Sequence, residues 1–350
     1  MILQLRGRKQ DSNYSYIQSS INPLQLSYHI IRNVVLGRSV AFNTVTLKTM
    51  IRQIGQEPAR FLEWLFLWLN LDFLHHQIKK MGDSQFVFHF LFRSTLVGDL
   101  LNKSLKFSGL VRLHTSSTVI NTVSLSEIFN ADNYRFQAIS EHCKSHFINT
   151  FDVYSEIEIV RQSVDYNLIS TIKKSPSNDK YKMICAGRLI PKKGILELIA
   201  CLAHLPNFLK KDLRVQIIGE GALENEINQA IKEEGLGDFV QLRGKLPHYS
   251  LLLEIANSDL MVVPSIETPS DVDGIPTVII ESMLLKTNVL TTSIGGIPEL
   301  VQHRKTGFIF DPTKPETFHQ VLSEVILETK KGVITAKAFE KAMKEYTRSN

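Results

Sequence analysis

Apolar and polar positions follow two periods along the second half of the chain. Short apolar runs of strand length alternate with segments of helical periodicity. In chain order these predicted strands and helices lie at 183–187, 195–205, 214–219, 223–234, 239–243, 251–257, 260–264, 277–285 and 288–292. This alternation is typical of βαβ units on a parallel sheet. Because ligands of such sheets bind at the carboxyl ends of the strands, the loops that follow the strands are where chemistry is expected.

The first half has the same kind of pattern but is less regular. Its predicted strands lie at 85–90, 108–113, 136–140 and 157–161. A polar, proline-containing stretch then has the composition of a linker. We therefore predict an α/β protein with two Rossmann-like domains facing a cleft. The predicted division is a first domain over 1–173, the linker over 174–180, a second domain over 181–335 and a closing helix over 336–350.

Composition narrows the class of protein. The chain has 350 residues, 43% of them hydrophobic and 21% charged, which fits about two ordinary folded domains and excludes a disordered or collagen-like chain. Cys143, Cys185 and Cys201 are too few and too scattered for a disulfide framework, so we expect a reducing, cytoplasmic setting. No run reaches the roughly 18 apolar residues of a transmembrane helix, which predicts a soluble or peripheral protein.

The net charge of +5 is unevenly distributed. Lys and Arg exceed Asp and Glu over residues 1–175, whereas the remainder is nearly balanced. This excess favours an anionic partner or the inner face of a membrane, and no basic-aromatic pattern of a nucleic-acid binder is present. The segment 61–73 would place Trp64 and Trp68 on one helix face. That face is either an interfacial membrane anchor or, as the pattern favours, part of a helix buried against a sheet.

Two clusters of candidate site residues follow predicted strands. Arg188 and Lys193 come after the strand at 183–187, and such a cationic pair suits a diphosphate, although a basic loop can also simply be solvated. In the second cluster, Pro276 suits a first helical turn, which would turn the backbone N–H groups of 275–278 toward an anion. Glu281 would then accept hydrogen bonds from sugar hydroxyls; the alternative is an acidic helix start that interacts with the helix dipole.

Six segments together resemble one family. They are GRLIPKKG at 187–194, IIGEGALENEI at 217–227, VQLRGKLPH at 240–248, VVPSIE at 262–267, DGIPTVIIESM at 273–283 and GGIPELV at 295–301. Their order and spacing resemble family-four glycosyltransferases of the GT-B fold, and most of all the colanic-acid and amylovoran-type transferases of exopolysaccharide synthesis. The resemblance covers nearly all of residues 181–325.

The resemblance implies a role for each matching residue. Arg188 and Lys193 would hold the diphosphate of a nucleotide-sugar donor, and Glu281 the ribose hydroxyls. Leu246 would lie beside the base. Asp273 would contact the donor sugar as a catalytic residue, although it replaces the Glu that is commoner in the family. The backbone amides from Ile275 through Pro276 to Thr277 would contact the phosphates, although Pro276 itself has no N–H group. No metal or other cofactor is implied.

The first half resembles the family more weakly. His114 matches the cleft histidine of the family, which is implied to contact the donor sugar or support catalysis, but the HTSS segment that follows it differs. His89 and the pair Ser140–Glu141 also lie at matching places. No strand, glycine loop and helix open the first domain, so we expect its first βα unit to be missing.

Three functions remain as alternatives. The preferred one is a retaining glycosyltransferase that moves a sugar from a nucleotide diphosphate to a glycan or lipid-linked acceptor in polysaccharide assembly. The triplet 271–273 also spells the D-x-D metal motif of another glycosyltransferase fold. The third is a catalytically silent family member that binds a nucleotide sugar or a partner transferase. His142, Cys143 and His146 have metal-like spacing, but a polar helix face is the favoured interpretation.

Overall fold

The computed structural model describes residues 2–6, 15–18, 85–89, 109–113, 134–151, 156–175, 180–269, 272–329 and 331–347. The chain divides into two compact units. The first comprises residues 1–114, 120–138 and 147–158, and the second comprises residues 115–119, 139–146 and 159–350. The predicted linker is only partly among the described residues, and the predicted domain boundaries stay predictions.

A six-stranded parallel sheet is the centre of the second unit. Its strands are β7 (Tyr181–Ala186), β8 (Leu213–Ile218), β9 (Val240–Leu242), β10 (Leu260–Val263), β11 (Asn288–Thr291) and β12 (Phe308–Ile309). They lie in the order β12-β11-β10-β7-β8-β9, and every neighbouring pair is parallel. This is the strand order of a doubly wound Rossmann sheet, as the alternating sequence pattern predicted.

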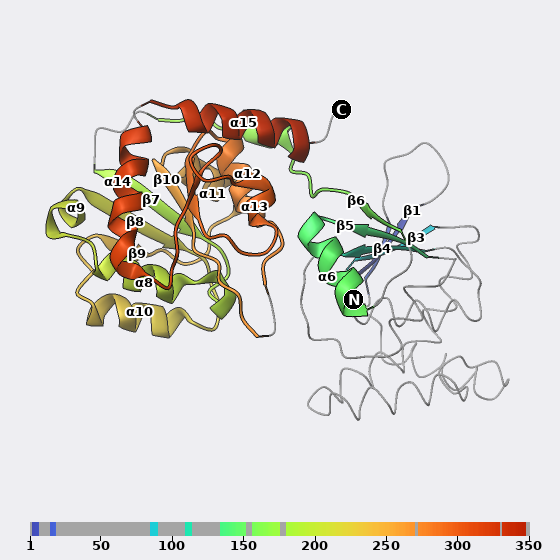
Figure 1. Cartoon of the computed structure of the whole chain (residues 1–350), viewed down its shortest axis with the longest axis horizontal. Helices are drawn as coiled ribbons and strands as arrows, with labels where there is room; N and C mark the ends of the chain where they lie inside the picture. The colour runs from blue at the N-terminus through green and yellow to red at the C-terminus, as the bar shows by residue number, and fades with distance from the viewer. Residues whose placement is uncertain are drawn as a thin grey trace, which may run out of the picture. The chain divides into compact units, whose positions relative to one another are not determined.

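Helices cover both faces of this sheet (Figure 1). One face carries α8 (Ile195–Ala203), α10 (Glu224–Glu233) and α14 (Phe318–Thr329), and the other carries α7 (Tyr166–Ser170), α11 (His248–Ala256), α12 (Thr277–Leu284), α13 (Ile297–Leu300) and α15 (Val333–Tyr346). The short elements η2 (Pro191–Lys193), α9 (Asn207–Lys211) and η3 (Pro315–Thr317) lie in connections. Two apolar cores result, one on each face.

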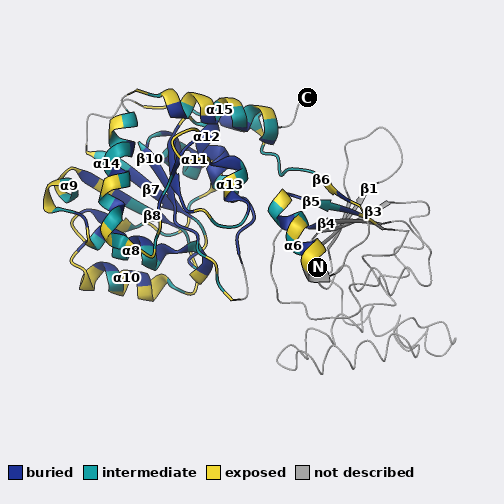
Figure 2. Ribbon diagram, in the orientation of Figure 1, coloured by how far each residue is buried: buried dark blue, intermediate teal, exposed yellow. Residues whose placement is uncertain are grey.

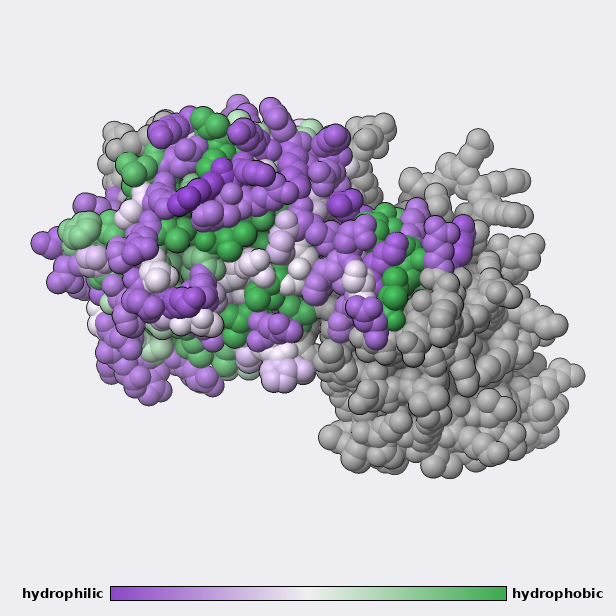
Figure 3. Space-filling view, viewed as in Figure 1, coloured by the Kyte–Doolittle hydropathy of each residue, from purple (hydrophilic) through white to green (hydrophobic). Residues whose placement is uncertain are grey.

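Burial follows this layering. The strands β10 and β11 are buried at every residue, and the inner faces of the helices are buried against them, as Figure 2 shows. Such continuous apolar strands are typical of a parallel sheet that is covered on both sides. Hydrophilic residues make up most of the face of this unit seen in Figure 3, with smaller apolar areas between them.

The first unit also contains a six-stranded sheet. Its order is β2 (Ser15–Gln18), β1 (Ile2–Arg6), β3 (Gln85–His89), β4 (Gly109–Leu113), β5 (Tyr134–Ala138) and β6 (Ile157–Ile159). The strands β3, β4 and β5 are parallel, whereas β1 is antiparallel to both of its neighbours. The four strands predicted for this half are therefore present, and an antiparallel pair that was not predicted lies at the sheet edge.

Three residues singled out in the first half lie outside the part of the chain that the structure describes. They are His114, Trp64 and Trp68. No helix in the described part of the chain is both long enough and apolar enough to cross a membrane.

The helix α6 (Glu141–Phe151) follows β5 and carries the three residues with metal-like spacing, His142, Cys143 and His146.

A glycine allows the loop between β7 and α8 to lie directly against the loop after β10. Gly194 has a positive φ of 63°, and a Cβ there would lie 1.8 Å from the carbonyl oxygen of Pro264. Gly235 has the same φ, but a Cβ there would have nothing within 4 Å. A comparison of the same substitution at these two glycines therefore distinguishes the cost of a left-handed backbone from the cost of steric overlap.

We expect Gly194→Ala to destabilise the chain far more than Gly235→Ala. The left-handed backbone alone costs a non-glycine residue about 1 kcal/mol, whereas overlap with a carbonyl oxygen adds to this for a total of about 3 kcal/mol or more at residue 194. Urea unfolding of both full-length variants, followed by circular dichroism, measures the difference. Equal losses would show that the two loops are not in close contact.

Candidate functional site

The topology of the second sheet places two loops side by side. The strands β7 and β10 are neighbours, but β7 is followed by β8 on one side of the pair and β10 by β11 on the other. The connections that leave β7 and β10 therefore diverge, and ligands of doubly wound sheets bind at such a switch point, at the carboxyl ends of the two strands. The first loop contains Arg188 and Lys193, and the second contains Asp273.

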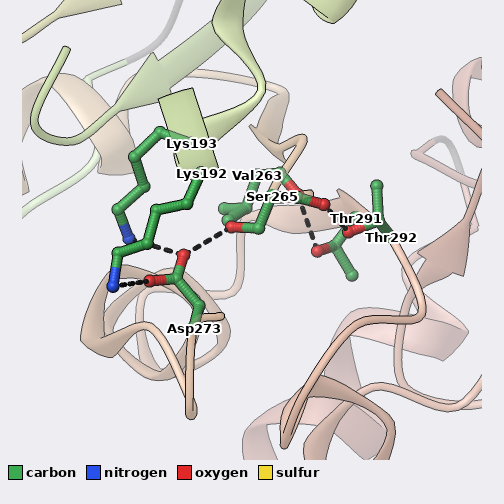
Figure 4. A network of polar contacts seen from close by, with 7 residues as sticks. All are labelled: Lys192, Lys193, Val263, Ser265, Asp273, Thr291 and Thr292. Atoms are coloured by element: carbon green, nitrogen blue, oxygen red, sulfur yellow. Dashed lines mark hydrogen bonds and ion pairs between the residues drawn. The ribbon is translucent and has the colours of Figure 1, made fainter. Parts of the chain in front are cut away.

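The two loops meet at a buried ion cluster (Figure 4). Asp273, of which 6% is exposed, accepts a hydrogen bond from Lys193 Nζ at 2.7 Å and one from Ser265 Oγ at 2.7 Å, both on Oδ2. Lys192 Nζ lies 3.3 Å from the other oxygen, Oδ1. Lys192 itself is 8% exposed and Ser265 is fully buried. We call these four residues the Asp273 cluster.

The cluster keeps Asp273 ionised. Burial by itself raises the pKa of this carboxyl, but the Lys193 ammonium, the Ser265 hydroxyl and Lys192 outweigh burial, and the pKa falls below its ordinary value of 3.8. A carboxylate with two ammonium groups has a net charge of +1. The cluster therefore remains attractive to an anion such as a diphosphate.

Backbone and hydroxyl hydrogen bonds fix the cluster in place. Ile266 N–H donates to the carbonyl of Lys192 at 3.0 Å and so ties the loop after β10 to the loop after β7. From the end of β11, Thr291 Oγ1 donates to the Val263 carbonyl at 2.8 Å, and Thr292 Oγ1 donates to the Ser265 carbonyl at 2.5 Å. The groups that hold Asp273 are thus supported by three neighbouring strands.

The helix α12 carries the second acidic residue of the predicted site. It begins at Thr277, as the sequence predicted, and Pro276 lies at the N-cap position, directly before the first helical turn for which the sequence favoured it. One turn on, Glu281 is 7% exposed, and its Oε1 lies 2.8 Å from Nε2 of His248, the first residue of α11. The sequence predicted the start of α11 at residue 251, but Pro247 fits the preceding position and the helix begins earlier, which brings His248 to Glu281.

The glycine loop after β11 closes over the backbone of the Asp273 loop. A Cβ on Gly295, whose φ is 58°, would lie 1.9 Å from the Asp273 carbonyl oxygen, and Gly296 N–H donates to the Gly274 carbonyl at 3.0 Å. The next polar residue, Glu299, accepts hydrogen bonds from the backbone N–H groups of Glu141 and His142 at 3.1 and 2.9 Å. Glu299 therefore caps the N-terminus of α6.

The structure brings some of the predicted residues together and not others. Lys193 and Asp273 are in direct contact, Arg188 is exposed in the same loop as Lys193, and Leu246 is half-buried against the core that contains α11 and α12. Ile275 and Pro276 are buried directly before α12. Sequence reasoning assigned no role to three residues that the geometry places in the site, namely Lys192, Ser265 and His248.

The two metal alternatives concern the triplet 271–273 and the helix α6. Asp271, the first member of the D-x-D triplet, lies outside them. On α6, Cys143 is buried, and burial raises the pKa of its thiol to about 12. Among the residues that the structure describes, no group of three or more His, Cys, Asp or Glu side chains is arranged to hold a metal ion. The three residues do lie on one helix, but Cys143 is fully buried whereas His142 and His146 are half-buried, so they do not form the single polar face that the sequence favoured.

The sequence motifs around this site match one protein family. The model of the family described as "Glycosyl transferases group 1" matches residues 169–348, about half of the chain. The chain belongs to glycosyl transferases group 1. The matched range contains the whole Asp273 cluster as well as Arg188 and Glu281, so the site described above is the part of the chain that is shared with the family.

Individual relatives agree with the predicted branch. The amylovoran biosynthesis glycosyltransferase AmsK of Erwinia amylovora is 26% identical over 182 residues, which are 51% of this chain and 42% of AmsK. WcaL of Salmonella typhimurium, assigned to colanic acid biosynthesis as a glycosyltransferase, is 27% identical over 195 residues, or 55% of this chain and 48% of WcaL. The matched segments thus span about half the length of these relatives.

Solved structures confirm the GT-B fold that the sequence predicted for this group 1 chain. Anabaena Alr3699/HepE, crystallised with UDP, superposes with a TM-score of 0.65 at 20% identity over 79% of this chain and 78% of that one. Sucrose-phosphate synthase of Thermosynechococcus elongatus gives a TM-score of 0.67 at 18% identity over 80% and 74% of the two chains.

We expect the ion cluster to make stability depend on pH through Asp273. Because the folded-state pKa of Asp273 is lowered, its ion pairs contribute stability that is fully present above the unfolded pKa of 3.8 and is lost as the pH falls through the folded pKa. The stability difference between the natural chain and Asp273→Asn should therefore be larger at pH 7 than at pH 3. Urea unfolding at both pH values measures it, and Asp238→Asn, at an exposed site, is the control. A difference that does not change with pH contradicts the assignment.

Proposed function

We propose that this chain is a retaining glycosyltransferase that moves a sugar from a nucleotide diphosphate to a glycan or lipid-linked acceptor in polysaccharide assembly. The observation that carries the proposal is the cationic cluster at the carboxyl ends of β7 and β10. There, Lys193 and Lys192 lie at a buried carboxylate with a net charge of +1, and the exposed Arg188 lies in the same loop.

The geometry supports a division of roles within the donor site. Arg188 and Lys193 would bind the diphosphate, since a guanidinium and an ammonium form charge-assisted hydrogen bonds with phosphate oxygens. The start of α12 would face the phosphates with the backbone N–H groups of Ile275 and Thr277, whereas Pro276 between them has no N–H to donate. Glu281 would bind the ribose hydroxyls through the carboxylate oxygen that His248 does not occupy, and Leu246 would lie beside the base.

The same residues account for the chemistry of the proposal. When the bond between the anomeric carbon and the diphosphate breaks, negative charge grows on the diphosphate. Cations that the fold already holds beside the diphosphate stabilise that charge without reorganising. The acceptor hydroxyl would attack the same face of the sugar, with retention, and would give its proton to an oxygen of the departing diphosphate. Because side-chain cations supply the positive charge, we propose that the reaction needs no metal ion and persists in excess chelator.

We assign binding of the acceptor substrate to the first half of the chain. His114 lies outside the described residues, and its role at the donor sugar or in catalysis stays a prediction. The excess of Lys and Arg over residues 1–175 fits an anionic surface, so we propose a cytoplasmic protein that acts at the inner face of the membrane, where a lipid-linked acceptor is available.

The first test is donor binding and turnover by the purified chain. A panel of UDP-, GDP- and ADP-sugars is scanned by thermal unfolding, in which a ligand at 100 times its dissociation constant should stabilise by about 2.7 kcal/mol. The donor that binds is then incubated with acceptor glycans, and the release of nucleoside diphosphate and the sugar product are measured. Binding without any product would favour the silent family member, and no stabilisation by any donor would refute the donor site itself.

We also expect the two predicted diphosphate contacts to be measurable separately. Arg188→Ala and Lys193→Ala should each weaken binding of the nucleoside diphosphate by about 1.5–3 kcal/mol, or roughly 10-fold to 150-fold, because each removes a hydrogen bond to a charged group. Lys232→Ala removes an exposed cation from α10 and should leave the affinity unchanged. Calorimetry on the three full-length variants decides, and unchanged affinity for both Arg188→Ala and Lys193→Ala would refute the assignment.

A further inference from the structure

A histidine at the start of α11 lies against the acidic residue of α12. His248 Nε2–H donates to Glu281 Oε1 at 2.8 Å, and the proton of this bond is on Nε2 because a carboxylate oxygen accepts. The Glu281 side chain is only 9% exposed, whereas that of His248 is 55% exposed. The imidazole therefore covers one oxygen of a buried carboxylate while more than half of its own surface stays open to solvent.

The packing of α11 against α12 determines where His248 lies (Figure 1). Leu252 and Ile255, four and seven residues after His248, are fully buried in the core that also contains Ile280 and Met283 of α12. Residues at these spacings share one face of a helix, so His248 lies on the face of α11 that packs toward α12. Because α11 follows β9, its first turn lies at the edge of the sheet where the carboxyl ends of the strands are.

The bond from His248 fixes the direction of the Glu281 carboxylate. The last torsion of a glutamate side chain is broad, so a carboxylate without a fixed partner samples many directions. With Oε1 held by α11, the plane of the carboxylate is set before a ligand arrives, which lowers the cost of ordering it on binding. A carboxylate has about four acceptor positions, and His248 uses one of them, so a pair of ligand hydroxyls can still be accepted.

We propose that His248 is a positioning residue for nucleoside recognition, which orients Glu281 to accept hydrogen bonds from the 2′- and 3′-hydroxyls of the donor's ribose. The proposal rests on the proposed function, in which Glu281 binds the ribose and Leu246 lies beside the base. Leu246 packs against the same core as α11 and precedes His248 by two residues. One short segment thus contacts the base and orients the acceptor of the adjoining ribose.

The experiment compares two ligands that differ only in the ribose hydroxyls. Calorimetry measures the affinity of the full chain for UDP and 2′,3′-dideoxy-UDP, or for the corresponding GDP or ADP pair, according to which base binds. An effect that passes through Glu281 to the hydroxyls changes the affinity for the first ligand alone. A change in the fold, or in the diphosphate contacts, changes the affinity for both ligands.

We expect His248→Ala to weaken binding of the nucleoside diphosphate by at least about threefold and to leave the affinity for the dideoxy ligand within about twofold of the natural value. His248→Gln should recover most of this loss, because its amide nitrogen lies at about the place of Nε2 and can donate the same bond. The amide nitrogen of His248→Asn lies at about the place of Nδ1, so this variant should behave like His248→Ala.

A double substitution separates positioning from direct contact. In the Glu281→Ala background, His248→Ala should have no further effect on either ligand, since the residue through which it acts is gone. His204→Ala is the control. This exposed histidine ends α8, which begins at the carboxyl end of β7 and runs back to the opposite edge of the sheet, so neither affinity should change.

Four results would overturn the inference: no loss in His248→Ala, an equal loss for both ligands, a loss that persists without Glu281, or the same behaviour of the Gln and Asn variants. If the natural chain binds both ligands equally well, ribose recognition by Glu281 fails, and the inference with it, while the diphosphate site stands. If the natural chain binds none of the nucleoside diphosphates, the proposed function itself fails, which distinguishes the two failures.

Discussion

The second unit depends on one electrostatic constraint, which is that an ammonium group cannot remain charged in a nearly dry interior without a partner. Lys192 is such a group, and Asp273 is its partner from a loop 81 residues further along the chain. To bring them together, the chain must place the carboxyl ends of β7 and β10 side by side. The parallel sheet does so, because both strands are central and neighbouring.

The architecture was predictable because it follows from local patterns. Apolar runs of four to six residues between helical segments have few folds available besides a covered parallel sheet, and the strands of the second unit lie within a residue or two of their predicted positions. The two-residue strand β12 and the one-turn helix α13 were not predicted, because elements this short bury too little surface to leave a period in the sequence.

The contacts within the site were only partly predictable. Of two adjacent cations, the sequence pointed to Lys193 and left Lys192 without a role, whereas both reach Asp273. Ser265 is an ordinary polar residue after a strand until the fold buries it beside a carboxylate. His248 was placed before its helix, so its contact with Glu281 was missed. The contacts of the two lysines and of His248 join segments that are distant in the sequence, and that of Ser265 joins two residues of one irregular loop. Local periodicity carries no information about either kind of pair.

The cluster also reconciles two opposed requirements. Recognition of a diphosphate favours many cations in a dry crevice, whereas stability of the empty protein favours few, since like charges repel and buried charges lose their hydration. A single carboxylate between two lysines satisfies both, because it neutralises one charge and leaves the other for a ligand. An Asp, shorter than a Glu by one methylene, suits this arrangement, since its carboxylate stays close to its own loop, within reach of Ser265, while the longer lysine side chains extend from the opposite loop to meet it.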